Sequence, residues 1–104
     1  MNSYVRFKLA LTEDEPVIKP YDEAAWALLR DTAETPIETS LVLLEALHHR
    51  WVILLRSLTE EQWTRTMRHP ENGLRRLDQV LAIYAWHGDH HLAHIANAIE
   101  FSRL

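Results

Sequence analysis

The 104-residue sequence contains no cysteine, only two glycines and only four prolines. Without thiols it can form no disulfide and has neither a thiolate metal ligand nor a cysteine nucleophile. Any transition-metal site must therefore use imidazole and carboxylate donors. Because glycine and proline are scarce, long uninterrupted helices are easier to place than a sheet rich in turns. The chain also lacks the run of roughly 18 apolar residues that a transmembrane helix needs, so no membrane association is expected.

Charge and length set further limits. The net charge of −4 argues against a broad nucleic-acid-binding surface. The opening stretch, MNSYVRFKLALTEDE, has no separate apolar region and ends in acids, unlike a secretory signal, so a cytoplasmic location is expected. A chain of 104 residues predicts a single domain, residues 1–104.

The apolar periodicity predicts an all-α fold. In the first part of the chain we expect a helix from Asn2 to about Asp14, an extended connector at Pro16 and Pro20, a short helix over Asp22–Leu29 and a polar break over Asp31–Thr35. A long helix capped by Thr39 or Ser40 then runs to Leu58, and a short helix capped by Thr59 follows it. A turn over Arg68–Gly73 leads to the last long helix, from Leu77 to about Phe101. This order favours an antiparallel bundle whose long helices number nearer three than four.

The last helix carries a cluster of histidines in the stretch YAWHGDHHLAH. His87 with His91, and His90 with His94, form two i,i+4 pairs. Such side chains lie one helical turn apart and can direct two imidazole nitrogens at one ion. The helical wheel places His91 at the edge of the apolar stripe with His87 just beside it, whereas His90 leans most toward solvent. The first pair is therefore the better chelating candidate.

A structural interpretation competes with metal binding at each histidine. On periodicity alone, a histidine on a helix flank is more often a surface or hydrogen-bonded residue than a ligand. His48 falls toward the apolar stripe of its own helix, where a bond to a carbonyl is favoured over a role as third ligand. His49 and His69 are expected to be exposed. Neither Asp89 nor Glu45 lies on an inner face, so no catalytic residue is assigned.

Three stretches carry a resemblance to a known family. YAWHGDHHLAHI resembles the last-helix signature of the YfiT-like branch of the DinB-like proteins, and SYVRFKLALTEDEPVIKPYDEAAWALL and LLEALHHRWVILLRSLTEEQW, with the RHPENG turn, resemble the same branch. The resemblance implies a four-helix bundle that binds one divalent metal, nickel or zinc, through three histidines, two of them His87 and His91. The family is described as metal-dependent hydrolases, and some YfiT-like members are implicated in transferring the thiol bacillithiol. The ion would activate a bound water or thiol near neutral pH.

The resemblance also predicts an incomplete bundle. In YfiT-like proteins the third histidine precedes the segment that resembles MNSYVRFKLALTED, so we expect an N-terminally truncated domain without that ligand. His48, His94, a carboxylate or a partner chain would have to replace it. A bundle without one helix also exposes an apolar groove larger than a monomer tolerates. We therefore expect a homo-oligomer, a two-fold dimer, that completes the fold.

Two functions follow from these residues. The first is a metal-dependent hydrolase or bacillithiol transferase that acts on a small molecule with a histidine-bound divalent metal. The alternative is a non-catalytic, self-associating helical remnant that has lost the complete metal site. A stoichiometric ion that depends on His91 distinguishes the first from the second.

Overall fold

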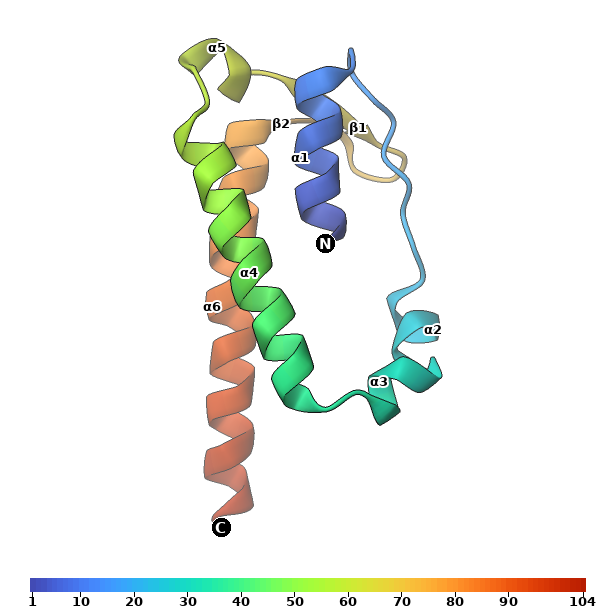
Figure 1. Cartoon of the computed structure of the whole chain (residues 1–104), viewed down its shortest axis with the longest axis vertical. Helices are drawn as coiled ribbons and strands as arrows, with labels where there is room; N and C mark the ends of the chain where they lie inside the picture. Colours follow the sequence, from blue (N-terminus) through green and yellow to red (C-terminus); the bar gives the residue numbers. More distant parts are fainter.

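The structure, a computed structural model, describes residues 1–104. Its elements are, in chain order, α1 (Asn2–Thr12), α2 (Glu23–Ala27), α3 (Arg30–Glu34), α4 (Ile37–Arg56), α5 (Glu60–Trp63), β1 (Thr66–His69), β2 (Gly73–Arg76) and α6 (Leu77–Ser102). The chain is mostly helical, as the sequence predicts, and α1, α4 and α6 are its three longest helices (Figure 1). None of the helices combines the length and apolar character that crossing a bilayer requires.

Two expected boundaries are wrong, both in the segment before α4. The expected polar break contains α3, in which the Arg30 guanidinium donates hydrogen bonds to the Glu34 carboxylate at 2.6 and 2.9 Å. This i,i+4 pair supports a single helical turn. α4 begins at Ile37 rather than after Thr39, because Pro36 has a fixed φ of −59° and its carbonyl already accepts the Thr39 backbone N–H at 3.1 Å. Pro36, directly before the first turn, therefore marks the start of α4.

The predicted N-terminal ends of α5 and α6 are confirmed. The Thr59 hydroxyl accepts the Gln62 backbone N–H at 3.2 Å, and the Gln62 side-chain oxygen accepts the Thr59 backbone N–H at 2.9 Å. This reciprocal capping box satisfies two donors that would otherwise lack partners. α6 begins at the expected Leu77 and ends within one residue of the expected Phe101.

The expected turn over residues 68–73 is the tip of a β-hairpin that the sequence analysis missed. β1 and β2 pair antiparallel, with His69 opposite Gly73, so the loop between them has three residues. Gly73 has a φ of +76°, the left-handed value that such a loop requires. The His69 Nδ1 accepts the backbone N–H groups of Glu71 and Asn72 at 3.1 and 3.2 Å, which holds the loop closed.

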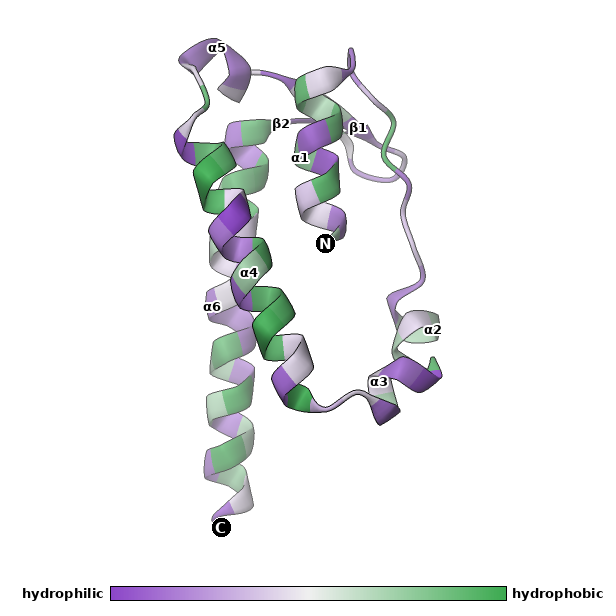
Figure 2. Ribbon diagram, in the orientation of Figure 1, coloured by the Kyte–Doolittle hydropathy of each residue, from purple (hydrophilic) through white to green (hydrophobic).

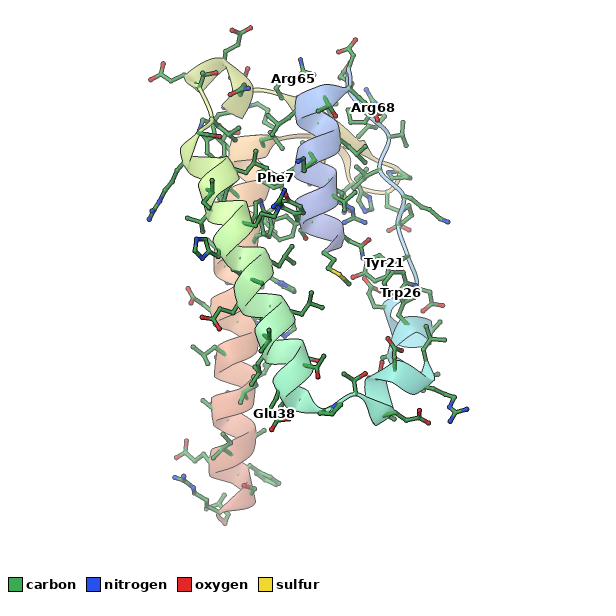
Figure 3. All side chains as sticks on the ribbon, in the orientation of Figure 1. Phe7, Tyr21, Trp26, Glu38, Arg65 and Arg68 are labelled. Atoms are coloured by element: carbon green, nitrogen blue, oxygen red, sulfur yellow. The ribbon has the colours of Figure 1, made fainter.

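The core is small and lies between α1, the hairpin and the start of α6, and α4 packs against it through the partly buried Trp51 and Leu55. Its buried apolar side chains are Phe7, Ala10, Ile18, Met67, Leu77 and Val80. Phe7 is fully buried and points from α1 toward α4 and α6 (Figure 3). Its ring meets Trp51 of α4 edge to face at 5.3 Å between centroids, and Trp51 meets Tyr84 of α6 at 5.7 Å. We call these three residues the aromatic junction.

Arg65 ties the hairpin to α1. Its guanidinium donates to the backbone carbonyls of Ala10 and Glu13 at 2.9 and 2.6 Å. These carbonyls belong to the end of α1, where the last groups have no partner within the helix and the helix dipole favours a cation. Figure 3 shows Arg65 at the end of α1 remote from the N-terminus. The arginine therefore fixes α1 against the segment that leads into β1.

Removing Phe7 should destabilise the fold far more than removing an exposed phenylalanine. Phe7→Ala is expected to lower the free energy of unfolding by about 3–5 kcal/mol, because it opens a cavity at the aromatic junction. Phe101 is 77% exposed, so Phe101→Ala is expected to change it by no more than about 0.5 kcal/mol. Urea unfolding followed by circular dichroism measures both. Equal losses in the two variants would contradict the assigned core.

Candidate metal centre

The rotation of α6 is fixed before the helix reaches the histidines. Leu77 and Val80 are buried in its first turn, and Tyr84 joins the aromatic junction one turn later. The Arg76 backbone N–H donates to the Gln79 side-chain oxygen at 3.1 Å and caps the start. Because a helix is rigid, these anchors determine where each side chain from His87 onward points.

His87 and His91 converge. Their Nε2 atoms lie 2.8 Å apart, and the ring centroids are separated by 4.3 Å with the planes nearly perpendicular. Two imidazole nitrogens bound at about 2.0–2.1 Å to one ion would lie about 2.9 Å apart at a right angle and about 3.3 Å apart in a tetrahedron. The observed separation is close to the first value. The pair therefore fits two adjacent ligands of one metal ion.

The second pair is arranged differently. The rings of His90 and His94 lie 4.2 Å apart between centroids, but no hydrogen bond joins their nitrogens. His90 stacks on Trp86 at 4.6 Å with an interplanar angle of 20°. His90 is also half-buried, whereas the other three histidines of the cluster are exposed. The expectation that His90 leans most toward solvent is wrong, because the indole one turn earlier covers it.

No third ligand meets the His87–His91 pair. The structure contains no group of three or more His, Asp or Glu side chains placed to hold one ion. His48, a possible substitute, is exposed, and its Nδ1 donates to the Leu44 carbonyl at 2.9 Å, which is the bond to a carbonyl that the sequence favours. That bond leaves Nε2 as an acceptor, which is the tautomer that metal-binding histidines adopt. His48 nevertheless does not join the pair within this chain.

The surroundings of the pair are more open than the helical wheel predicts. His87 and His91 are both exposed, although their position places them at the inner edge of the stripe. A Cβ added at Gly88, between His87 and His91, would meet no atom within 4 Å apart from its own helix backbone. Beyond the histidines the apolar stripe of α6 is also exposed: Leu92, Ile95 and Ile99 are exposed by 65%, 58% and 49%.

A polar cavity of about 210 Å³ lies beside His87. It is lined by Asn2, Ser3, Arg6, Pro20, Tyr21, Glu23, His69 and Tyr84 together with His87. These residues come from α1, the connector, α2, the hairpin and α6, and sequence reasoning singled out only His87 among them as a site residue. His69 was expected to be exposed and is half-buried. Since its Nδ1 accepts two backbone N–H groups, its neutral ring carries the proton on Nε2.

A second cavity, about 290 Å³ and mainly apolar, lies between α4 and α6. Its lining includes His48, Trp51, Leu81, Tyr84 and Gly88. The indole Nε1–H of Trp51 is buried and has no acceptor in this chain. The two cavities share Tyr84, so the aromatic junction separates a polar space from an apolar one.

The pKa of His91 is lowered from the ordinary histidine value. The main cause is the loss of hydrating water around its ring, and the neighbouring imidazoles of His87, His94 and His90 add electrostatic repulsion. Both effects disfavour the charged ring. A neutral ring is the form that binds a metal ion, so crowding the four histidines favours the ligand state.

Comparison with known proteins decides the family. The family model of the DinB superfamily matches residues 1–95. The chain belongs to the DinB superfamily. A DinB-like relative from Halalkalibacterium halodurans, named "putative metal-dependent hydrolase", is 54% identical over 99 residues, which cover 95% of this chain and 57% of the relative. Another of the same name, from Oceanobacillus iheyensis, is 57% identical over 97 residues, covering 93% and 56%.

A solved DinB-like structure agrees with the fold. YfiT from Bacillus subtilis, described as "a probable metal-dependent hydrolase with an unusual four-helix bundle topology", superposes with a TM-score of 0.89 at 49% identity. The match covers 93% of this chain and 56% of YfiT. The resemblance to the YfiT-like branch and the helical-bundle fold are thereby confirmed. The chain spans little more than half the length of the relatives it matches.

The histidine titration tests the electrostatics of this DinB-like site. In the metal-free protein, the His91 ring proton signal is expected to titrate below the ordinary histidine pKa of about 6.5. Because the unfolded chain then binds this proton more readily than the folded chain, the free energy of unfolding should fall as the pH drops below that value and level off below the folded pKa. NMR spectra of the wild type and His91→Asn assign the signal. A midpoint at or above the ordinary value would contradict the crowding.

Proposed function

We propose that this chain acts as a metal-dependent hydrolase in which His87 and His91 hold one divalent ion, nickel or zinc. The 2.8 Å convergence of their Nε2 atoms carries the proposal. Its support from outside the chain is that relatives more than 50% identical are named as metal-dependent hydrolases. The proposal places this chemistry in the cytoplasm, as the sequence predicts.

The ion would supply a nucleophile near neutral pH by lowering the pKa of a bound water. The chain's own residues would bind and orient the substrate in the polar cavity beside His87. Arg6 and the Nε2–H of His69 line this cavity as donors, and Glu23 lines it as an acceptor. Its volume of about 210 Å³ is smaller than the 300–1,000 Å³ that is typical of ligand pockets. The substrate would therefore be a small polar molecule or the polar end of a larger one.

A catalytic metal site normally has three protein ligands and one open position. Because the chain places no third donor beside the His87–His91 pair, we infer that another segment packed against α6 supplies it. A transferase using bacillithiol would need the same ion, which deprotonates a bound thiol as it does a water. The absence of a third protein ligand beside the pair is also the observation that favours the alternative, a non-catalytic remnant. Whether the protein binds a metal ion distinguishes the non-catalytic remnant from the hydrolase and from the transferase.

Metal binding is expected to depend on His87 and His91 and not on His94. With untagged protein, calorimetric titration with zinc sulfate or nickel chloride should show one ion per site. His87→Ala or His91→Ala should weaken binding by at least about 100-fold, because each removes a direct ligand. His94→Ala is the matched control from the same helix and should change affinity by less than about threefold.

The same titration has two contrary outcomes. If His94→Ala abolished binding while His91→Ala did not, the ligand pair would be His90 and His94. If the wild type bound no ion after loading with either metal, the hydrolase proposal would fail and the non-catalytic alternative would stand.

A further inference from the structure

The inner face of the hairpin carries polar groups beside the core. Met67 and Arg75 lie opposite one another in the antiparallel pair, and His69 follows Met67 by two residues on β1. Side chains opposite one another, and side chains two residues apart, share one face of a sheet. Because Met67 is buried, this shared face is the inner one, and His69 and Arg75 lie on it.

A recess of about 170 Å³ lies on this inner face, and we call it the hairpin recess. Its floor consists of core side chains from the connector, β1 and α6, namely Ile18, Met67 and Val80, which are 3%, 2% and 7% exposed. Figure 2 shows the connector apolar (green) where it passes beside the hydrophilic hairpin (purple). The recess shares three lining residues with the polar cavity beside His87: Arg6, His69 and Tyr84. The two spaces therefore adjoin.

Arg6 lines both spaces with most of its guanidinium free. The side chain is half-buried, and its Nη2 donates to the Lys19 carbonyl at 2.9 Å. A guanidinium has five N–H donors, so this bond positions the group and leaves other donors for a ligand. No carboxylate of the chain forms an ion pair with Arg6, although three other arginines have such a partner. A half-buried cation of this kind is suited to bind an anion from outside the chain.

Positive charge and donors gather in the hairpin recess. The Nδ1 of His69 accepts two backbone N–H groups of the loop, so Nε2–H is the free donor of a neutral ring. Arg75 adds a second guanidinium that forms no ion pair. The lining of the recess contains no Asp or Glu, whereas that of the polar cavity contains Glu23. The recess is therefore a local positive region in a chain with a net charge of −4.

We infer that the hairpin recess binds the carboxylate or phosphate group of a small-molecule substrate, with the Arg6 guanidinium and the Nε2–H of His69 as donors. A guanidinium matches either oxyanion with two parallel hydrogen bonds. The apolar floor favours a ligand that carries an apolar segment beside this group. The inference rests on the proposed function only for the position of the reacting bond, which lies toward His87. The binding of the anion itself needs no metal ion.

The two adjoining spaces set the size and the direction of such a substrate. The recess and the polar cavity have volumes of about 170 and 210 Å³. Each alone is below the range of about 300–1,000 Å³ that is typical of ligand pockets, and together they reach it. Glu23 lines only the space beside His87, where its charge repels an anion, whereas Arg6 and Arg75 attract one into the recess. The substrate is therefore an anion whose reacting bond lies away from its charged group.

NMR titration of the metal-free, untagged chain tests the binding. Butyrate and inorganic phosphate are the probes, at constant ionic strength, and butyramide is the neutral control of similar shape. We expect saturable binding of at least one anion with a dissociation constant of about 1–10 mM, the affinity of so small a fragment. Butyramide should bind at least about tenfold more weakly, because it lacks the charge. The shifted signals should be the Arg6 Nε–H and the backbone amides of His69 and Asn72, which line the recess.

Three arginine variants locate the site. Arg6→Gln should weaken binding of the anion at least about tenfold, because it removes a charged donor. Arg75→Gln should weaken it about threefold, since water screens this exposed side chain. Arg75 forms no ion pair, so this variant is informative even if Arg6→Gln disturbs the connector through the lost bond to Lys19. Arg68→Gln is the matched control and should change affinity less than about twofold, because Arg68 precedes His69 on β1 and its side chain lies on the opposite face.

Shifts spread over basic residues outside the recess, equal affinity for butyramide and butyrate, or equal losses in Arg68→Gln and Arg6→Gln would overturn the inference. His91→Ala separates it from the proposed function, since this variant should lose the metal ion and keep its affinity for the anion. Loss of the anion as well would place it at the histidines and overturn the recess. A wild type that binds the anion in the recess but no metal ion overturns only the hydrolase. One that binds a metal ion and neither anion overturns only this inference.

Discussion

The aromatic junction is the contact on which the rest of this structure depends. Phe7, Trp51 and Tyr84 come from the three longest helices, and each ring packs against the other two. There is no disulfide, and the buried core cluster has only six apolar residues. With a core of this size we expect a small free energy of unfolding, because the stability of a domain is a small difference between large opposing terms. These ring contacts join α1, α4 and α6 at one place.

The junction also determines where chemistry can occur. Tyr84 contributes its ring to the core and to the walls of both cavities. His87 follows Tyr84 by less than one helical turn. The packing of Tyr84 on one side of α6 therefore fixes where the imidazoles on the adjacent side of the helix lie. Because α6 is a continuous helix, the packing of the half-buried Tyr84 also fixes the directions of the exposed His87 and His91 side chains.

The sequence predicts the parts of the molecule that depend on local chemistry. The capping box at Thr59, the start of α6 at Leu77 and the one-turn spacing of His87 and His91 all follow from neighbouring residues, and the structure contains each of them. The family, too, is correctly identified from the quoted stretches.

The parts that the sequence misses depend on distant neighbours. β1 and β2 have four residues each and no alternating pattern. The connector after α1 supports β1 from its other edge, where the Ile18 backbone N–H donates to the Arg68 carbonyl at 3.0 Å. The polar cavity draws on five segments that no local pattern connects. Periodicity likewise indicates an apolar side of α6, but how much of that side is covered depends on segments far away in the sequence, and His87 and His91 are exposed.

Arg65 has a consequence for the order in which this chain folds. Its bonds to Ala10 and Glu13 join residues 55 and 52 positions apart, across half of the sequence. Closing so long a loop costs entropy before any contact repays it, whereas α4 and α6 can form from local bonds alone. We therefore expect the docking of α1 on Arg65 to follow the formation of α4 and α6, because it closes the longer loop.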